Sequence, residues 1–393
     1  MSTTCAAFIV ILITTGMTSA IDHQLTLLGG CAGALIFAGC GFVSRRAQLF
    51  PTFLFGTIAI SAIVLVSSEA NICEFSSTIH ILSCYLALIS LAVSSADLSK
   101  FSQQVIMGNN LWLTGWVLYQ AHNADTLKAW AISNPSGAGN LMAAQINMTL
   151  PLVLVRIHES TGLLKLAYQG LLGLNCLSVF LVMSRNGIGS MLIVLTLYVM
   201  FNYKRLAIVI IGMIGGAAIA LDSIIQIPIV HDTLVKYRFI GFVPVAPRSV
   251  IWEVSFQHIM KNPMLGVGPG KPQKLLAVLD IHHAHNNFVQ VAFESGIPAC
   301  IIFTLMMGLL LWMPARMVLQ KREYFVYTLP VIAYFIFSWT AGPLVFPGAT
   351  LLLGICVNEA RVAIRRQEEQ AEQDRQLILS VPTRPRSRLA NAA

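Results

Sequence analysis

NNFVQVAFESGIPACIIFTLMMGLLLWM, residues 286–313, contains an apolar stretch that is long enough to cross a lipid bilayer. A helix needs about 20 mainly apolar residues to span a hydrocarbon core of roughly 30 Å. The sequence contains twelve such stretches, which are separated by polar residues, glycines or prolines. They lie near residues 5–21, 25–43, 50–68, 78–96, 103–121, 138–155, 163–183, 187–203, 205–221, 286–313, 324–342 and 343–360. We therefore expect an all-α membrane protein with about twelve transmembrane helices.

The composition supports this class of protein. The chain has 393 residues, of which 56% are hydrophobic and only 11% are charged, too few charges to cover a water-facing globule of this size. Its eight cysteines are scattered and form neither a CxxC pair nor the framework of a secreted disulfide domain. We interpret them as small packing residues.

Basic residues are distributed unequally between alternate predicted loops. One set of short loops holds ten lysines and arginines, whereas the other, leaving out one long loop, holds only Lys128 and Arg185. Cytoplasmic loops carry the excess of Lys and Arg in membrane proteins, so both termini are expected in the cytoplasm. Seven further arginines follow residue 360, in a basic tail expected to be a short solvated helix with a disordered end. The net charge of +8 thus reflects topology, and no nucleic acid partner is expected.

One loop is much longer than the others. It covers about residues 222–285, between the ninth and tenth predicted helices, on the face opposite the termini. We therefore expect a single transmembrane domain over residues 1–360, in which 222–285 form a large non-cytoplasmic loop, followed by a cytoplasmic tail over 361–393. A long loop in a chain of short loops is more often functional than not. Arg185, in the turn between helices seven and eight, emerges on the same face.

The long loop contains a predicted amphipathic helix, PRSVIWEVSFQHIMKNP, residues 247–263. One face carries Ile251, Val254, Ser255 and Ile259. Another carries Arg248, Trp252 and Phe256 at i, i+4 spacing. Taken alone, this pattern equally fits an interfacial helix with a tryptophan anchor and a snorkelling arginine. The following GVGPG lacks the Lys-Ser/Thr pair of a phosphate loop, so we expect a tight turn.

Three histidines precede the tenth helix. Asn286 is a suitable N-cap, which places His285 just outside the first turn at the membrane mouth. Within the helix, Asn287, Gln290 and Glu294 form a polar stripe that must face the bundle interior. A metal site at His282, His283 and His285 lacks a neighbouring Cys or Asp/Glu cluster, Asp280 aside, so no metal is expected.

The combination of His285, Arg185 and Arg248 on one face suits a lipid diphosphate. Two guanidinium groups can bind diphosphate oxygens in bidentate fashion. A neutral imidazole can accept the proton of an attacking hydroxyl. His282 and His283 are expected to be ordinary solvated loop residues.

Three motifs, in this order and on this face, resemble the O-antigen ligase and polymerase superfamily: SRNGIGS (184–190), PRSVIWEVSFQHIMKNPMLGVGPG (247–270) and HAHNNFVQVAFESGIPA (283–299). SGAGNLMAAQINMTLPLVLV (136–155), which includes Asn140, is similar to a further family element. Ala299 stands where the family commonly has glycine, which we interpret as a packing variation. The resemblance implies a GT-C-type fold and an enzyme of the bacterial inner membrane whose active site faces the periplasm.

The resemblance also implies the roles of individual residues. Arg185 and Arg248 would bind the diphosphate of an undecaprenyl-diphosphate-linked glycan, and His285 would activate the acceptor hydroxyl. The residues expected around these three are Asn140, Trp252, Asn286, Asn287, Gln290 and Glu294. The reaction would invert the anomeric centre and use neither a metal nor a cofactor.

The activity within the superfamily is left open by the sequence. The compact chain favours an O-antigen ligase, which transfers polysaccharide to a sugar of lipid A-core, over a polymerase or a protein O-oligosaccharyltransferase. A lipid-linked sugar transporter is a further alternative, although the chain lacks the internal repeat that such proteins often show. The sequence does not indicate an oligomeric state.

Overall fold

The computed structural model describes residues 6–7, 9–11, 23–43, 48–49, 51–94, 98–123, 139–182, 184–203, 205–206, 208–209, 212, 227–229, 231–232, 248–279, 281, 283–320, 322–340 and 347–380. The longer helices are α2 (His23–Val43), α3 (Pro51–Ala70), α4 (Phe75–Leu86), α5 (Ser99–Asn123), α6 (Gly139–Glu159), α7 (Gly162–Leu181), α8 (Arg185–Asn202), α12 (Arg248–Lys261), α14 (Asn287–Gln320), α15 (Leu329–Thr340) and α16 (Pro347–Ser380). Shorter elements are η2 (Ala87–Ala92), α13 (Lys271–Leu276), η5 (Ala277–Leu279) and η6 (Arg322–Thr328). A two-residue antiparallel pairing joins β1 (Gln48–Leu49) to β2 (Val93–Ser94), which is the one departure from an all-α architecture in the described residues.

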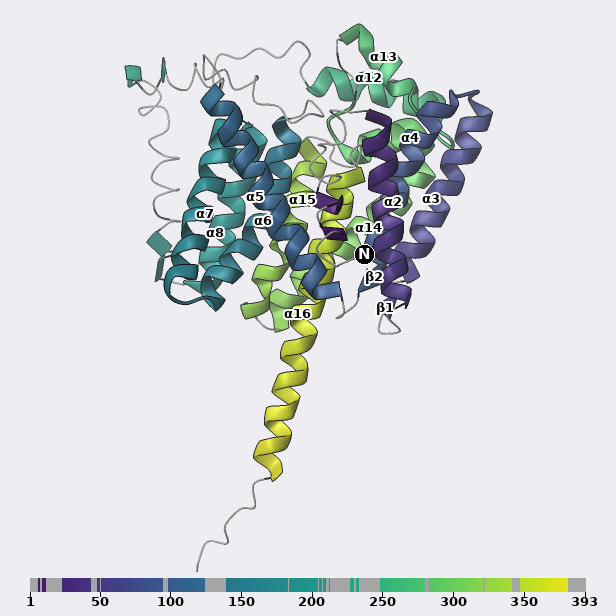
Figure 1. Ribbon diagram of the computed structural model, residues 1–393. Helices are drawn as coiled ribbons and strands as arrows, with labels where there is room; N and C mark the ends of the chain where they lie inside the picture. Colours follow the sequence, from purple (N-terminus) through teal and green to yellow (C-terminus); the bar gives the residue numbers. More distant parts are fainter. Residues whose placement is uncertain are drawn as a thin grey trace, which may run out of the picture.

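The long helices run side by side as a bundle, with α12 and α13 across one end and the C-terminal part of α16 projecting from the other (Figure 1). Six of the described helical segments are long and apolar enough to cross a membrane: 51–70, 75–92, 139–159, 162–181, 287–319 and 347–377. The prediction of a helical membrane protein is confirmed. The count of about twelve spans stays a prediction, since most of the first and ninth predicted stretches lie outside the described residues.

Burial distinguishes central helices from helices at the periphery. Every residue of α6 from Leu141 to Val155 is buried, whereas α7 buries few of its side chains. Large apolar side chains are exposed on the outer helices, among them Phe55 (67%), Leu163 (85%) and Leu305 (64%). Exposed apolar surface on helices of this length is the pattern expected of lipid contact. It supports the assignment of the bundle to a membrane.

The fifth predicted stretch contains Asn109 and Asn110, two polar residues in an otherwise mainly apolar run. The structure has one continuous helix there, α5, in which both asparagines are fully buried. Asn110 Nδ2 donates to Thr149 Oγ1 of α6 at 2.9 Å, and Thr114 Oγ1 donates to Asn175 Oδ1 of α7 at 2.6 Å. Polar side chains inside a membrane bundle commonly link helices in this way. Asn110 therefore joins α5 to α6, and neither asparagine interrupts the helix.

The chain after residue 340 departs from the predicted boundaries. The twelfth stretch was expected at 343–360, but α16 begins at Pro347 and continues as a single helix to Ser380. The predicted helical start of the tail is thus continuous with the last apolar helix, and residues 366–377 are exposed. The division of the chain at residue 360 and the cytoplasmic placement of the termini stay predictions.

Candidate active site at one end of the bundle

Arg185 is positioned by the contact between α6 and α8. It is the first residue of α8, and Ser184 caps this helix by accepting a hydrogen bond from the Gly187 N–H at 2.9 Å. Ser184 Oγ in turn donates to Asn140 Oδ1 of α6 at 2.6 Å. Asn147, about two turns further along α6, donates its Nδ2–H to the Gly187 carbonyl at 2.8 Å. Asn140, which the sequence placed near the site, thus acts on the start of α8 through Ser184.

Arg248 is the first residue of α12, the helix predicted inside the long loop. Ile251, Ser255 and Ile259 are buried against the bundle, which confirms the predicted apolar face. Part of the long loop before Arg248, including 233–247, lies outside the described residues. Trp252 does not serve only as a membrane anchor, because its indole Nε1 donates to the Ala284 carbonyl at 3.0 Å.

The glycine turn after α12 packs against an interruption in α14. At Gly296 the backbone is non-helical (φ 84°, ψ 175°), which leaves helical carbonyls without their usual partners. The Val267 and Gly268 N–H groups donate to the Phe293 and Glu294 carbonyls at 2.8 and 3.0 Å. These two amides are therefore engaged within the protein, and the expected tight turn, not a phosphate loop, is confirmed.

The start of α14 has the predicted cap. Asn286 Oδ1 accepts from the Phe288 and Val289 N–H groups at 2.9 and 3.2 Å. His285 lies immediately before this cap with φ at +52°, in the left-handed region. A non-glycine residue there is strained by about 1–3 kcal/mol and persists only where its surroundings hold it. Such outliers cluster at functional sites.

The surroundings hold His285 through its neighbour Ala284. The Ala284 N–H donates to Gln290 Oε1 at 2.8 Å, while the Ala284 carbonyl accepts from Trp252. Gln290 Nε2 donates to Glu294 Oε1 at 2.7 Å, and both side chains are buried. We call the four residues Trp252, Ala284, Gln290 and Glu294 the backbone clamp. Gln290 and Glu294 thus contribute by fixing the loop that carries His285.

The remaining predicted residues have other surroundings. Asn287 is fully buried, and its Nδ2 donates to Ser338 Oγ at 3.0 Å, which ties α14 to α15. The His283 ring lies 4.1 Å from the His285 ring between centroids, so it is not simply a solvated loop residue. His282 lies outside the described residues. Within those residues no group of three or more His, Cys, Asp and Glu side chains is arranged for a metal, and the expectation of a metal-free site stays a prediction.

Electrostatic effects connect the two arginines and the histidine. Partial burial lowers the pKa of the Arg248 guanidinium, and the positive charge of Arg185 lowers that pKa further. Burial also lowers the pKa of the His285 imidazole, and Arg248 adds to this effect. Arg248 therefore lies within electrostatic range of both Arg185 and His285. A lowered pKa keeps the imidazole in its neutral, proton-accepting form to lower pH, while the arginines can bind an anion.

Some of these contacts were not predicted. Ser184 was quoted only as part of a motif, although a serine directly before a helix is a recognisable N-cap. Gly296 carried no expectation, although an isolated glycine followed by Pro298 in an apolar helix indicates a break. Ala284 has no sequence signal, because only its backbone takes part.

Taken together, the fold and the site define a helical membrane protein with a cationic, histidine-containing site at one end of its bundle. Residues 170–304 match the family model Wzy_C, described as O-antigen ligase. This match over residues 170–304 confirms the resemblance seen in the motifs. Members of this family are glycosyltransferase-like ligases or polymerases that act on lipid-linked glycans. No curated protein has significant similarity to the chain.

Proposed function

We propose that this protein is an O-antigen ligase of the bacterial inner membrane, with its active site facing the periplasm. It transfers polysaccharide from undecaprenyl diphosphate to a sugar hydroxyl of lipid A-core. The observation that carries the proposal is that Trp252 of α12, the helix that begins with Arg248, is hydrogen-bonded to the residue before His285, with Arg248 also in electrostatic range of Arg185 and His285. These residues all lie inside the segment that matches the family.

In the proposed reaction, the acceptor hydroxyl gives its proton to a nitrogen of the His285 imidazole. The hydroxyl oxygen then forms a bond to the anomeric carbon of the donor sugar. The bond between that carbon and the diphosphate oxygen breaks with its electron pair, and undecaprenyl diphosphate leaves. Attack opposite the leaving group inverts the anomeric centre, and the step needs no metal.

The two arginines stabilise the leaving group. Charge-assisted hydrogen bonds to phosphate oxygens contribute about 1.5–3 kcal/mol each. Arg185 and Arg248 are the first residues of α8 and α12, so the positive ends of two helix dipoles add to the same field. This positive field stabilises the negative charge that develops on the diphosphate as the glycosidic bond breaks.

The assignment to a ligase is tested by transfer in vitro. The purified protein is given an undecaprenyl-diphosphate-linked glycan with lipid A-core as the acceptor, and the products are separated by size. Glycan attached to lipid A-core supports the ligase. Longer chains that remain on the carrier lipid, with no core product, indicate a polymerase of the same superfamily. A serine- or threonine-containing peptide in place of lipid A-core tests the protein O-oligosaccharyltransferase.

A further inference from the structure

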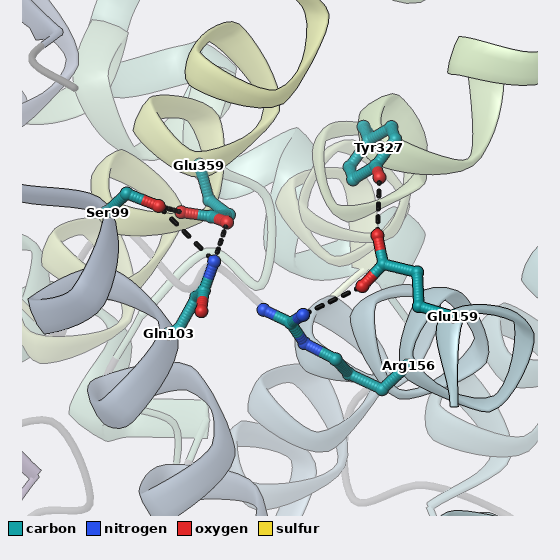
Figure 2. A network of polar contacts seen from close by, with 6 residues as sticks. All are labelled: Ser99, Gln103, Arg156, Glu159, Tyr327 and Glu359. Carbon is teal, nitrogen blue, oxygen red and sulfur yellow. Dashed lines mark hydrogen bonds and ion pairs between the residues drawn. The ribbon is translucent and has the colours of Figure 1, made fainter. Parts of the chain in front are cut away.

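A second group of polar side chains links α5, α6, η6 and α16 (Figure 2). Glu359 of α16 accepts hydrogen bonds from Ser99 Oγ at 3.1 Å and from Gln103 Nε2 at 2.7 Å. Arg156 of α6 forms an ion pair with Glu159 at 2.7 Å. Figure 2 shows the Arg156 guanidinium between the Glu359 group and the Glu159 group.

The position of this group follows from α6, which reaches both ends of the bundle. Asn140, near its first residue, bonds the Ser184 cap beside Arg185, whereas Arg156 is in its last turn. Asn140 and Arg156 are 16 positions apart in α6, which places them about 24 Å apart along the helix axis at 1.5 Å per residue. The second group is therefore separate from the candidate active site.

A cavity of about 210 Å³ opens beside these side chains. Its apolar wall comes from α5, α6 and α16, and its polar lining includes Arg156, Glu159, Glu359 and Arg366; the apolar lining residues are Ile106, Met107, Leu152, Val155 and Ala363. The volume is smaller than that of a typical drug-sized site and is of the size of a small polar headgroup. An apolar wall beside a charged opening, at the end of a membrane-crossing helix, suits a lipid at the membrane boundary.

The charges of the lining limit the ligand further. The formal charges of the two arginines and two glutamates in the lining sum to zero, so the cavity does not favour a ligand with only a negative or only a positive charge. Arg156 and Arg366 both lie within electrostatic range of the Glu359 carboxyl. Arg366 lines the cavity, is exposed, and forms no ion pair or hydrogen bond with another of the described residues. A ligand that carries both a positive and a negative group satisfies this lining.

We infer that the cavity binds the phosphoethanolamine headgroup of a membrane phospholipid. The ammonium group, with its three N–H donors, is bound on the side of the two carboxylates, and the phosphate is bound by Arg366. The parts of the lipid acyl chains nearest the glycerol lie along the apolar wall of the cavity. A choline headgroup has no N–H to donate to the carboxylates, and a glycerol headgroup has no positive charge for them. This inference does not depend on the proposed glycosyl transfer.

Native mass spectrometry of the full-length protein tests the inference. The protein is mixed with phosphatidylethanolamine, phosphatidylcholine and phosphatidylglycerol of identical acyl chains, and the retained lipid is counted. We expect preferential retention of phosphatidylethanolamine. Arg366→Gln and Glu359→Gln should each reduce that retention about tenfold, the effect of losing one charge-assisted contact. Arg375→Gln, which removes the same charge further along α16 and outside the cavity, should leave it unchanged.

Since Arg366 is exposed, its replacement tests binding without disturbing the buried network. Equal retention of the three lipids, preference for phosphatidylglycerol, or wild-type retention in Arg366→Gln would each overturn the inference. Binding of free phosphoethanolamine without retention of the phospholipid would overturn the lipid assignment. Transfer activity is not measured, so failure of this experiment and failure of the proposed function are distinguishable.

Discussion

Trp252 of α12 and Ala284, the residue before His285, are joined by a 3.0 Å hydrogen bond from the indole Nε1 to the backbone carbonyl. This bond connects the helix that begins with Arg248 to the loop that carries His285. Because Gln290 of α14 holds the other side of the same residue, the histidine is fixed relative to two helices. Hydrogen bonds from side chains to the Ala284 backbone therefore set the position of His285, the proposed base, relative to Arg248, which is proposed to bind the diphosphate.

Loosening the backbone clamp should reduce turnover more than donor binding. Gln290→Leu removes the acceptor of the Ala284 N–H, and Trp252→Phe removes the donor to its carbonyl. We expect each to lower the rate of glycan transfer about 10- to 100-fold, since small displacements of a catalytic group have effects of this size. Steady-state kinetics should show the loss in kcat with little change in KM for the donor. Gln257→Leu, on the exposed face of α12, is the matched control. An equal loss in this control would show that the clamp has no special role.

The pKa of His285 predicts the pH dependence of transfer. Burial and Arg248 lower that pKa below the ordinary value of about 6.5, so the neutral imidazole persists into mildly acidic solution. The decrease in rate on acidification should therefore have its midpoint below pH 6.5, the ordinary pKa of histidine. Arg248→Gln should raise the pKa of His285 and shift this decrease to higher pH. Modification of His285 by diethyl pyrocarbonate, followed by mass spectrometry across the pH range, measures the pKa without relying on residual activity. An unchanged profile in Arg248→Gln would contradict the predicted interaction.

Replacing each arginine by lysine should impair the enzyme although the charge is kept. Arg185→Lys and Arg248→Lys lose the planar pair of donors that binds two phosphate oxygens at once. We expect transfer to fall about tenfold or more, with weaker binding of the undecaprenyl-diphosphate donor. Arg375→Lys, on the exposed part of α16, controls for general effects of the substitution. Wild-type transfer in either variant would remove that arginine from the site.

Gly296→Ala should destabilise the protein. A Cβ at this position would collide with the Met264 carbonyl, and φ of +84° is strained for alanine by about 1–2 kcal/mol even without the collision. Detergent-solubilised protein should unfold at a Tm several degrees lower than wild type. Gly308→Ala in the same helix has nothing within 4 Å of the added Cβ and should leave the Tm unchanged or raise it. Equal melting of the two variants would show that the break in α14 is not needed for stability.

Local patterns in the sequence predicted the parts of the site that lie within one element. The apolar face of α12 follows from its i, i+4 spacing, and the cap at Asn286 follows from a side chain that competes for backbone N–H groups. The burial of Gln290 and Glu294 was predicted because ionisable and amide groups in a membrane helix must avoid lipid.

Contacts between distant residues could not be predicted from one sequence. Ser184 and Asn140 are 44 residues apart, and the Gly268–Glu294 bond depends on how the turn packs against α14. The length of α16 was missed for a different reason. The part of α16 after residue 360 is polar, so a search for apolar stretches does not detect it. Hydrogen bonds between side chains one turn apart, such as Gln370–Asp374, support the helix there.

The central claim is that this site transfers glycan from the carrier lipid with His285 as the proton acceptor. The most direct test compares wild-type protein and His285→Ala for transfer of an undecaprenyl-diphosphate-linked glycan to lipid A-core, with donor binding measured in the same samples. We predict glycan on lipid A-core with the wild type, and with His285→Ala a rate lower by roughly 10² to 10⁴ while the donor is still bound. Wild-type transfer by His285→Ala would contradict the assigned role of His285, and the absence of transfer by the wild type would contradict the proposed ligase.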